Sequence, residues 1–221
     1  MRVLIFGATG MVGRGALREC LLAADVESIT TIGRAATGLR DQKLREFVHE
    51  NLFDYRAIEP ELAGFHACFF CLGVSSSGMT EAQYTRLTYD LTLSAATTLA
   101  RLNPKMTFIY VSGAGTDSQG RSMWARVKGR TEDALRSLPL RAYAFRPGVI
   151  QPLHGERSKT PSYRSFYRFA APLLPLVRAM FPRFILTTTL IGEAMLQVAR
   201  HGADRPVLEA ADIYVTALQR I

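Results

Sequence analysis

The strongest constraint on this chain lies near its start, where a short apolar run leads directly into three evenly spaced glycines. Val3 to Phe6 is a continuous apolar run, which is typical of a buried parallel strand. Gly7, Gly10 and Gly13 follow it, and a helical pattern continues to about Ala24. Glycine lets the backbone turn sharply and come close to a ligand, and the free N–H groups at a helix start bind phosphate. A strand, a glycine-rich turn and a helix in this order predict a dinucleotide-binding site.

Composition places the chain among ordered globular proteins. Its 221 residues are 48% hydrophobic and 21% charged, enough for one α/β domain with a well-buried core. We expect a single domain over residues 1–221, with 150–221 forming mostly a small substrate cap and closing helices. No uncharged apolar run approaches the roughly 20 residues of a membrane span. Because the first strand begins at residue 2, we expect no signal peptide and a cytoplasmic protein.

The charge balance suggests an anionic small-molecule ligand. Lysine and arginine number 27 against 19 acidic residues, a net charge of +8, but the basic residues are scattered and form no nucleic-acid motif. We therefore expect no nucleic-acid partner. Cys68 and Cys71 lie three apart on an expected strand and so point to opposite faces, and we expect no disulfide between them. The histidines have no metal-ligand spacing, and no metal is expected.

Further strand patterns alternate with helical patterns along the chain. Strands are expected at residues 28–33, 45–50, 66–72, 106–111, 140–145 and 206–208, and helices at 55–62, 81–101, 121–137, 188–201 and 210–219. Such alternation predicts an α/β fold, a Rossmann-type doubly wound parallel sheet of order 3-2-1-4-5-6. Ligands in these sheets bind outside the carboxyl ends of the strands. We therefore expect the site at that edge.

The end of the second strand favours NADP(H) over NAD(H). In this type of fold an acid at this place binds the ribose 2′-OH of NAD, whereas an arginine accommodates the 2′-phosphate of NADP. Arg34 stands there, and Arg14 can reach the same phosphate. One charge-assisted hydrogen bond contributes about 1.5 to 3 kcal/mol, which is a roughly ten- to hundredfold preference. The alternative is that both arginines are simply solvated.

Other cofactor contacts are expected at the turn and at the strand ends. Asn51 and Leu52 follow the third strand and flank the adenine, while we expect Asp54 to cap the next helix. Leu72 and Gly73 are expected to touch the cofactor where the fourth strand ends. The remaining predicted contacts are Thr9, Met11, Val12, Pro147, Gly148 and Val149.

Six short motifs at these strand ends carry a resemblance to a known family. They are GATGMVG at 7–13, IGR at 32–34, CLG at 71–73, VSGAG at 111–115, VKG at 127–129 and RPGVI at 146–150. The chain resembles the short-chain dehydrogenase/reductase superfamily, in its atypical branch near the NmrA-like and Tat-interacting-protein-like NADP-binding proteins. The resemblance covers residues 1 to about 155.

The resemblance implies a catalytic serine with a Tyr-x-x-x-Lys pair, in which tyrosine transfers the proton and lysine lowers its pKa and holds the ribose. Ser112 matches the serine and Lys128 the lysine, and both are expected to contact the cofactor as well. Trp124 stands in the tyrosine position. An indole N–H donates a hydrogen bond but does not give up its proton near neutral pH, whereas a phenol with a pKa of about 10 can be tuned to do so.

Three functions remain open. The first is an NADP(H)-dependent oxidoreductase or epimerase-like enzyme on a small carbonyl or hydroxyl substrate, with Tyr163, Tyr167 or a water supplying the proton. The second is a non-catalytic regulatory protein that senses NADP(H). The third is an accessory protein whose arginine- and aromatic-rich segment, 159–183, binds a membrane surface or a lipophile. Monomer and homodimer are both compatible with the sequence.

Overall fold

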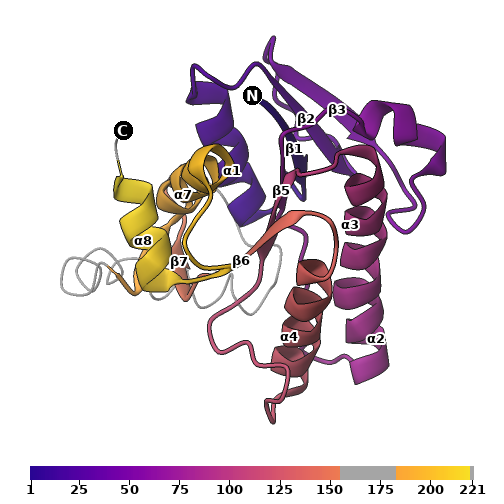
Figure 1. Cartoon of the computed structure of the whole chain (residues 1–221), viewed down its shortest axis with the longest axis vertical. Helices are drawn as coiled ribbons and strands as arrows, with labels where there is room; N and C mark the ends of the chain where they lie inside the picture. Colours follow the sequence, from indigo (N-terminus) through magenta and orange to yellow (C-terminus); the bar gives the residue numbers. More distant parts are fainter. Residues whose placement is uncertain (155–182, 220–221) are drawn as a thin grey trace.

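The computed structural model describes residues 1–154 and 183–219 (Figure 1). Within them, a seven-stranded parallel sheet has the order β3-β2-β1-β4-β5-β6-β9. Its strands are β1 Arg2–Phe6, β2 Ser28–Gly33, β3 Leu44–Val48, β4 Ala67–Phe70, β5 Thr107–Val111, β6 Arg141–Arg146 and β9 Val207–Glu209. The predicted fold class and the predicted order of the first six strands are confirmed. The short strand predicted at 206–208 becomes β9 and extends the sheet beyond β6.

Helices cover both faces of the sheet. Figure 1 shows α1, α7 and α8 on one side and α2, α3 and α4 on the other. Their bounds are α1 Met11–Leu22, α2 Glu81–Thr85, α3 Leu91–Leu102, α4 Met123–Arg136, α7 Thr188–His201 and α8 Ala210–Leu218, with a 3₁₀ helix, η1, at Arg56–Leu62. Two short strands, β7 Val149–Gln151 and β8 Ile185–Thr187, pair in a separate parallel sheet that the sequence did not predict.

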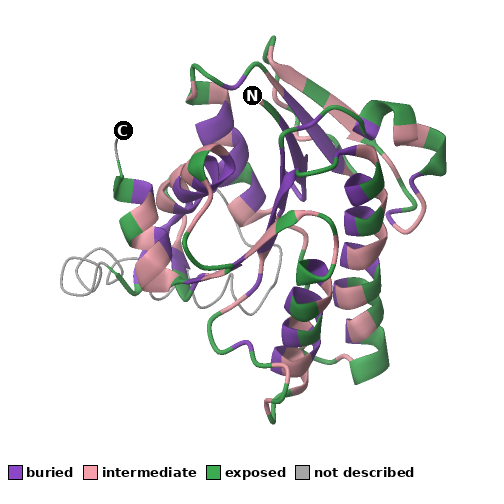
Figure 2. Ribbon diagram, viewed as in Figure 1, coloured by how far each residue is buried: buried purple, intermediate pink, exposed green. Residues whose placement is uncertain are grey.

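Alternation along the strands divides the apolar core into two layers. Val3 and Ile5 of β1 pack toward α1 and α7, whereas Leu4 and Phe6 pack toward α3 on the opposite face. Figure 2 shows the central strands and the inward faces of the helices buried, whereas β3 at the edge of the sheet is partly exposed. Because both faces are covered, a continuous apolar run suits each central strand. Cys68 packs in the α3 layer and Cys71 against the other, as their spacing predicts.

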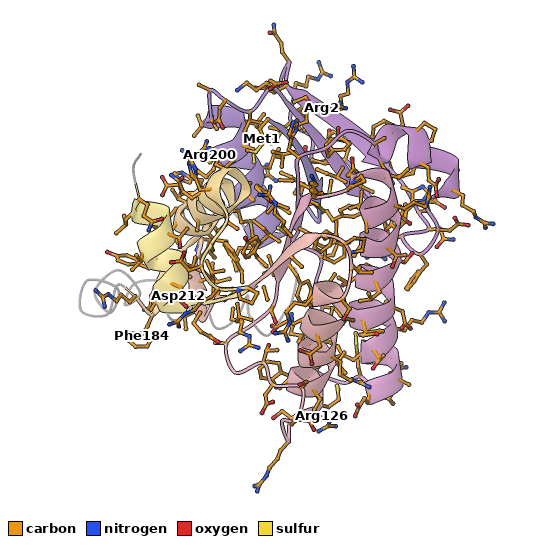
Figure 3. The ribbon with its side chains drawn as sticks, viewed as in Figure 1. Met1, Arg2, Arg126, Phe184, Arg200 and Asp212 are labelled. Atoms are coloured by element: carbon orange, nitrogen blue, oxygen red, sulfur yellow. The ribbon has the colours of Figure 1, made fainter. Side chains whose placement is uncertain are left out.

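Helices α1 and α7 run parallel and pack closely. A Cβ atom at Gly15 would lie 2.7 Å from Cβ of Thr188, so the two helices touch near their first turns. Their far ends are joined by Arg200, which binds the carboxylate of Asp25 at 2.6 and 3.0 Å (Figure 3). The amino-terminal ends of both helices therefore lie at the carboxyl edge of the sheet, with the glycine-rich turn.

Three predicted details are wrong. The third strand ends at Val48, not residue 50, because the chain turns at Asn51, whose Oδ1 accepts the N–H of Phe53. Asp54 is not the N-cap: Tyr55 precedes η1 and has no side-chain cap, while Asp54 accepts the backbone N–H of Arg56 at 3.0 Å. The guanidinium of that arginine also binds Asp54 and lowers the pKa of its carboxyl to about 2.

The third correction concerns the helix expected at 81–101. It is interrupted by a π-helical turn, η2, over Arg86–Asp90, which separates α2 from α3. Within this stretch the hydroxyl of Thr92 donates to the carbonyl of Thr88, four residues earlier, at 2.5 Å.

Candidate functional site

The glycine-rich turn is built for a close backbone approach. Gly7 has φ +77°, and a Cβ there would lie 2.9 Å from the backbone of Cys71 and Leu72. A Cβ at Gly13 would lie 2.2 Å from the carbonyl oxygen of Gly7, so only glycine fits. Gly10 caps α1 without any side-chain hydrogen bond. The first N–H groups of α1 are therefore available to an anion, and the turn fits the pyrophosphate of a dinucleotide.

The loop after β4 lies against this turn. Leu72 contributes the backbone nitrogen that Gly7 approaches, and Gly73, which follows it, is exposed, so that a Cβ atom there would have no neighbour within 4 Å. The structure thus brings the predicted cofactor residues Gly7 and Leu72 together. Thr9, Met11 and Val12 lie in the same turn and are partly exposed.

Ser112 follows β5 and is buried, with its backbone N–H bound to the carbonyl of Phe145 at 2.7 Å. Its Oγ lies 3.0 Å from Oγ1 of Thr116, a residue that sequence reasoning missed. The hydroxyl of Thr116 itself donates to the carbonyl of Gly113 at 2.8 Å. Because that proton is already used, Ser112 is the donor in the pair, and its own lone pairs remain free to accept.

The loops after β5 and β6 are joined. The N–H of Ala114 donates to the carbonyl of Pro147 at 3.2 Å, which places the predicted contacts 147–149 beside the loop that carries Ser112. Pro147 is buried, whereas Gly148 and Val149 are exposed. The predicted residues from strands β5 and β6 therefore lie at one edge, as expected from parallel strands.

Lys128 projects from α4 toward the end of β5. Its Nζ donates to the carbonyl of Val111 at 3.3 Å and lies 5.2 Å from the ring centroid of Tyr110. Burial lowers the pKa of Lys128 to about 8, against the opposing influence of Glu132 one helical turn further on. The ammonium is thus held in a poorly solvated place next to the peptide bond that joins Val111 to Ser112.

Trp124 lies one helical turn before Lys128 on α4 and is partly buried. A Cβ at Gly113 would be 3.9 Å from its indole ring, and a Cβ at Gly115 would be 3.7 Å away. The indole therefore lies beside the loop that follows Ser112. The structure brings Ser112, Trp124 and Lys128 to one end of β5.

A buried ion pair that sequence reasoning missed supports this arrangement. Glu132 is 3% exposed and binds Arg146 through both carboxylate oxygens, at 3.0 and 2.6 Å. Arg146 also binds Glu209 at 3.0 Å. The four-residue spacing of Lys128 and Glu132 on α4 is visible in the sequence, but nothing local indicates that Glu132 pairs with an arginine on β6.

The residues predicted to contact the adenosine part of the cofactor differ in their exposure. Arg14 and Arg34 are exposed, and neither guanidinium has an ion pair or hydrogen bond among the residues that the structure describes. Asn51 is exposed and uses its Oδ1 within a turn. Leu52 is 5% exposed and packs in the core, so its side chain is turned away from a ligand at the surface.

Part of the predicted site falls outside the described residues. The tyrosines considered as proton donors, Tyr163 and Tyr167, lie there, as does most of the segment 159–183. In the described part of the chain, no three metal-ligating side chains gather into a metal site. Nor does any helix there have the length and apolar character needed to cross a membrane.

Comparisons with known proteins place this geometry in context. No family model matches the chain. It is 27% identical over 209 residues to the mitochondrial protein FMP52-2 of Scheffersomyces stipitis, covering 92% of this chain and 87% of that protein. It is 26% identical over 199 residues to protein HTATIP2 of Rattus norvegicus, covering 83% and 81%.

Solved structures share the fold at low sequence identity. UDP-glucose 4-epimerase from Thermus thermophilus, in complex with NAD, superimposes with a TM-score of 0.69 at 14% identity, covering 98% of this chain and 82% of that one. An oxidoreductase of the short-chain dehydrogenase/reductase family from Burkholderia thailandensis gives 0.68 at 15% identity, covering 97% and 92%.

The relatives correct one expectation. The FMP52 proteins of several fungi that match this chain are named mitochondrial, which contradicts the cytoplasmic location expected from the sequence. That expectation depended on the absence of an apolar leader, and this property does not distinguish the cytoplasm from mitochondria, whose targeting segments are amphipathic and not apolar.

Fold, turn and relatives agree on the family. The sheet order is that of the NAD(P)-binding Rossmann proteins, and the glycine-rich turn occupies the place where these proteins bind pyrophosphate. The matches in sequence and in structure agree with that assignment. In sequence the chain is similar to the FMP52 and HTATIP2 proteins, and in fold to proteins of the short-chain dehydrogenase/reductase family, and both likenesses support the resemblance to the atypical branch of that superfamily.

Proposed function

We propose that this protein binds NADP(H) and acts as an oxidoreductase or epimerase-like enzyme on a small carbonyl or hydroxyl substrate. One observation supports the proposal most strongly. Ser112, Trp124 and Lys128 lie together at the carboxyl end of β5, at the same edge of the sheet as the glycine-rich turn. A hydroxyl and an ammonium beside a dinucleotide site are the groups that polarise and protonate a substrate oxygen.

Residues of three strand ends would hold the cofactor. The N–H groups at the start of α1 would bind the pyrophosphate, and Lys128 would reach the ribose next to the nicotinamide. Arg14 and Arg34 are exposed cations whose guanidinium groups have no partner among the described residues, and they suit the 2′-phosphate of NADP. The nicotinamide supplies hydride chemistry when the cofactor is bound.

Ser112 would orient the substrate oxygen. In the ligand-free protein its proton is directed to Thr116. Rotation of the hydroxyl toward the substrate lets it donate a hydrogen bond to a carbonyl oxygen, while the unrotated form accepts a hydrogen bond from a substrate alcohol. Trp124 would contact the substrate through its ring or its N–H group, but it would not transfer the proton.

Calorimetric titration with NADPH and, separately, with NADH at one salt concentration tests the cofactor assignment. We expect NADPH to bind at least tenfold more tightly, since one charge-assisted contact contributes about 1.5 to 3 kcal/mol. The Arg34→Ala variant should lose most of that preference and Arg14→Ala a part of it. Arg40→Ala, an exposed arginine in the following loop, is the matched control. Equal affinities for the two cofactors would contradict the role of Arg34.

The single tryptophan gives a second, independent readout. Trp124 is the only tryptophan of the chain and stands at the proposed site. Bound NADPH should therefore quench its emission by energy transfer to the reduced nicotinamide, with a midpoint that matches the calorimetric affinity. Saturating NADPH that leaves the tryptophan emission unchanged would place the cofactor elsewhere.

A second function is favoured by one observation, the tryptophan in the tyrosine position. A protein that binds NADP(H) without a proton donor would sense the cofactor and report it to a protein partner. In that case NADPH should bind without being oxidised by any carbonyl compound, and NADPH and the partner should change each other's affinity by the same factor.

The enzyme makes a different prediction. The Ser112→Ala variant should lose turnover while it still binds NADPH.

A further inference from the structure

We infer that Lys128 is the proton donor and acceptor of the site and takes over the task of the tyrosine that Trp124 replaces. The inference rests on the proposed function, because it assigns a role within the same reaction.

The position of the amine suits proton transfer to a substrate held by Ser112. The carbonyl that Nζ binds belongs to the peptide bond joining Val111 to Ser112, so the amine lies directly beside the serine. An ammonium has three N–H donors, and this contact of 3.3 Å uses one of them. The ring of Tyr110 covers another side of the amine at 5.2 Å. The remaining N–H groups are available to a ligand.

The surroundings leave the ammonium without a carboxylate of its own. Glu132, on the same face of α4, has both oxygens on Arg146. The other titratable or charged side chains on the elements packed against α4 are Glu81 and Tyr84 of α2, Arg86, Tyr89 and Asp90 of η2, Arg101 of α3, Tyr110 of β5, and Arg141, Tyr143 and Arg146 of β6. Of all these groups, Glu132 alone contributes a charge that acts on Lys128. Burial outweighs it and lowers the pKa of Lys128 to about 8, so both protonation states are accessible near neutral pH.

The proton transfer balances in both directions. In reduction, the carbonyl carbon of the substrate takes a hydride from the dihydronicotinamide, and the carbonyl oxygen takes a proton from the ammonium of Lys128. The amine keeps the electron pair of the broken N–H bond and regains a proton from water. In oxidation, the neutral amine takes the proton of the substrate alcohol while the hydride leaves for the oxidised nicotinamide.

Titration of the lysine side chains tests the inference without any substrate. The chain has four lysines, so a protein labelled with ¹³C at lysine Cε gives few signals, and Lys128→Arg identifies the one of interest. We expect Lys128 to titrate near 8, well below the ordinary pKa of a lysine side chain, about 10.4. A midpoint of Lys128 at or above that ordinary value overturns the inference.

NADPH oxidation with a panel of aldehydes, ketones and quinones gives the second readout. The rate of reduction should fall as pH rises through the Lys128 midpoint, because the ammonium form is required. Lys128→Arg, which stays charged at all these pH values, should retain NADPH binding and lose at least a hundredfold in rate. A Lys128→Arg enzyme with the wild-type rate and pH profile overturns the inference.

Glu132→Gln separates a proton-transfer role from a merely structural one. Removing the carboxylate removes the charge that raises the pKa of Lys128, so the NMR midpoint and the pH profile should both move down, by the same amount. If only one of them moves, Lys128 is not the titrating group in the reaction. Failure of the wild type to bind NADPH or to turn over any of the panel would overturn the proposed function and, with it, the inference. Normal turnover with an ordinary lysine titration would overturn the inference alone.

Discussion

At the scale of single residues, Lys128 costs the folded protein stability at neutral pH. Its pKa is about 8 in the folded state against an ordinary value of 10.5, so between these values the unfolded chain binds more protons and stability rises with pH. The shift corresponds to about 3 kcal/mol, at roughly 1.36 kcal/mol per pKa unit. The penalty is fully present below the folded pKa and is lost as pH approaches the unfolded pKa.

The prediction that follows concerns Lys128→Met. It should raise the free energy of unfolding at about pH 7 by up to about 3 kcal/mol, with a gain that shrinks toward about pH 10. Urea unfolding at several pH values measures it. Lys105→Met, which changes an exposed lysine, is the control and should have little effect at any of these pH values. A gain from Lys128→Met that is the same at both ends of the range would contradict the depressed pKa.

At the scale of elements, the pair Glu132–Arg146 joins α4 to β6, and Glu209 extends the connection to the start of α8. Breaking a buried ion pair leaves an uncompensated charge, which typically costs about 3 to 5 kcal/mol. Arg146→Met should therefore destabilise the protein by about that amount in urea unfolding.

The matched control for Arg146→Met is Arg126→Met on α4. Arg126 binds Glu81 at 2.7 Å, and both side chains are partly exposed, at 34% and 43%; pairs that solvent reaches contribute about 0 to 1 kcal/mol. Figure 3 shows Arg126 near the lower end of the molecule, far from Met1. Equal losses of unfolding free energy in the two variants would show that burial of the Glu132 carboxylate is not the reason why Arg146→Met destabilises the protein.

At the scale of the whole molecule, the net charge of +8 favours an anionic ligand. The field of the protein and the exposed Arg14 and Arg34 are both screened by salt. Raising the ionic strength from about 0.05 to about 0.3 M should therefore weaken NADPH binding severalfold, and more than it weakens NADH binding, since NADPH carries the additional phosphate. Calorimetry at four salt concentrations measures both. Identical salt dependence for the two cofactors would mean that no arginine contacts the 2′-phosphate.

The central fold was predictable from local patterns. The apolar runs of β1, β4 and β5 and the helical pattern of α4 involve residues a few positions apart, and their burial on both sheet faces is a direct consequence of their composition. The glycine-rich turn was predictable for the same reason at Gly13, which is crowded by the carbonyl of Gly7 six residues earlier, whereas the close approach at Gly7 involves the distant backbone of Cys71 and Leu72. Boundaries were less predictable where side chains bind the backbone, as at Asn51 and Asp54.

The sequence by itself determined the order of the first six strands, the edge at which we propose that a ligand binds, and the candidates Ser112 and Lys128. Tertiary structure alone decided their surroundings. It placed the ring of Tyr110 beside the ammonium of Lys128 and paired Arg146 with Glu132. The pairing of Arg146 with Glu209 spans 63 residues, and that of Arg126 with Glu81 spans 45. The physical reason is that a local pattern sets which way a side chain faces, whereas its partner and its solvation depend on which distant element is packed against it.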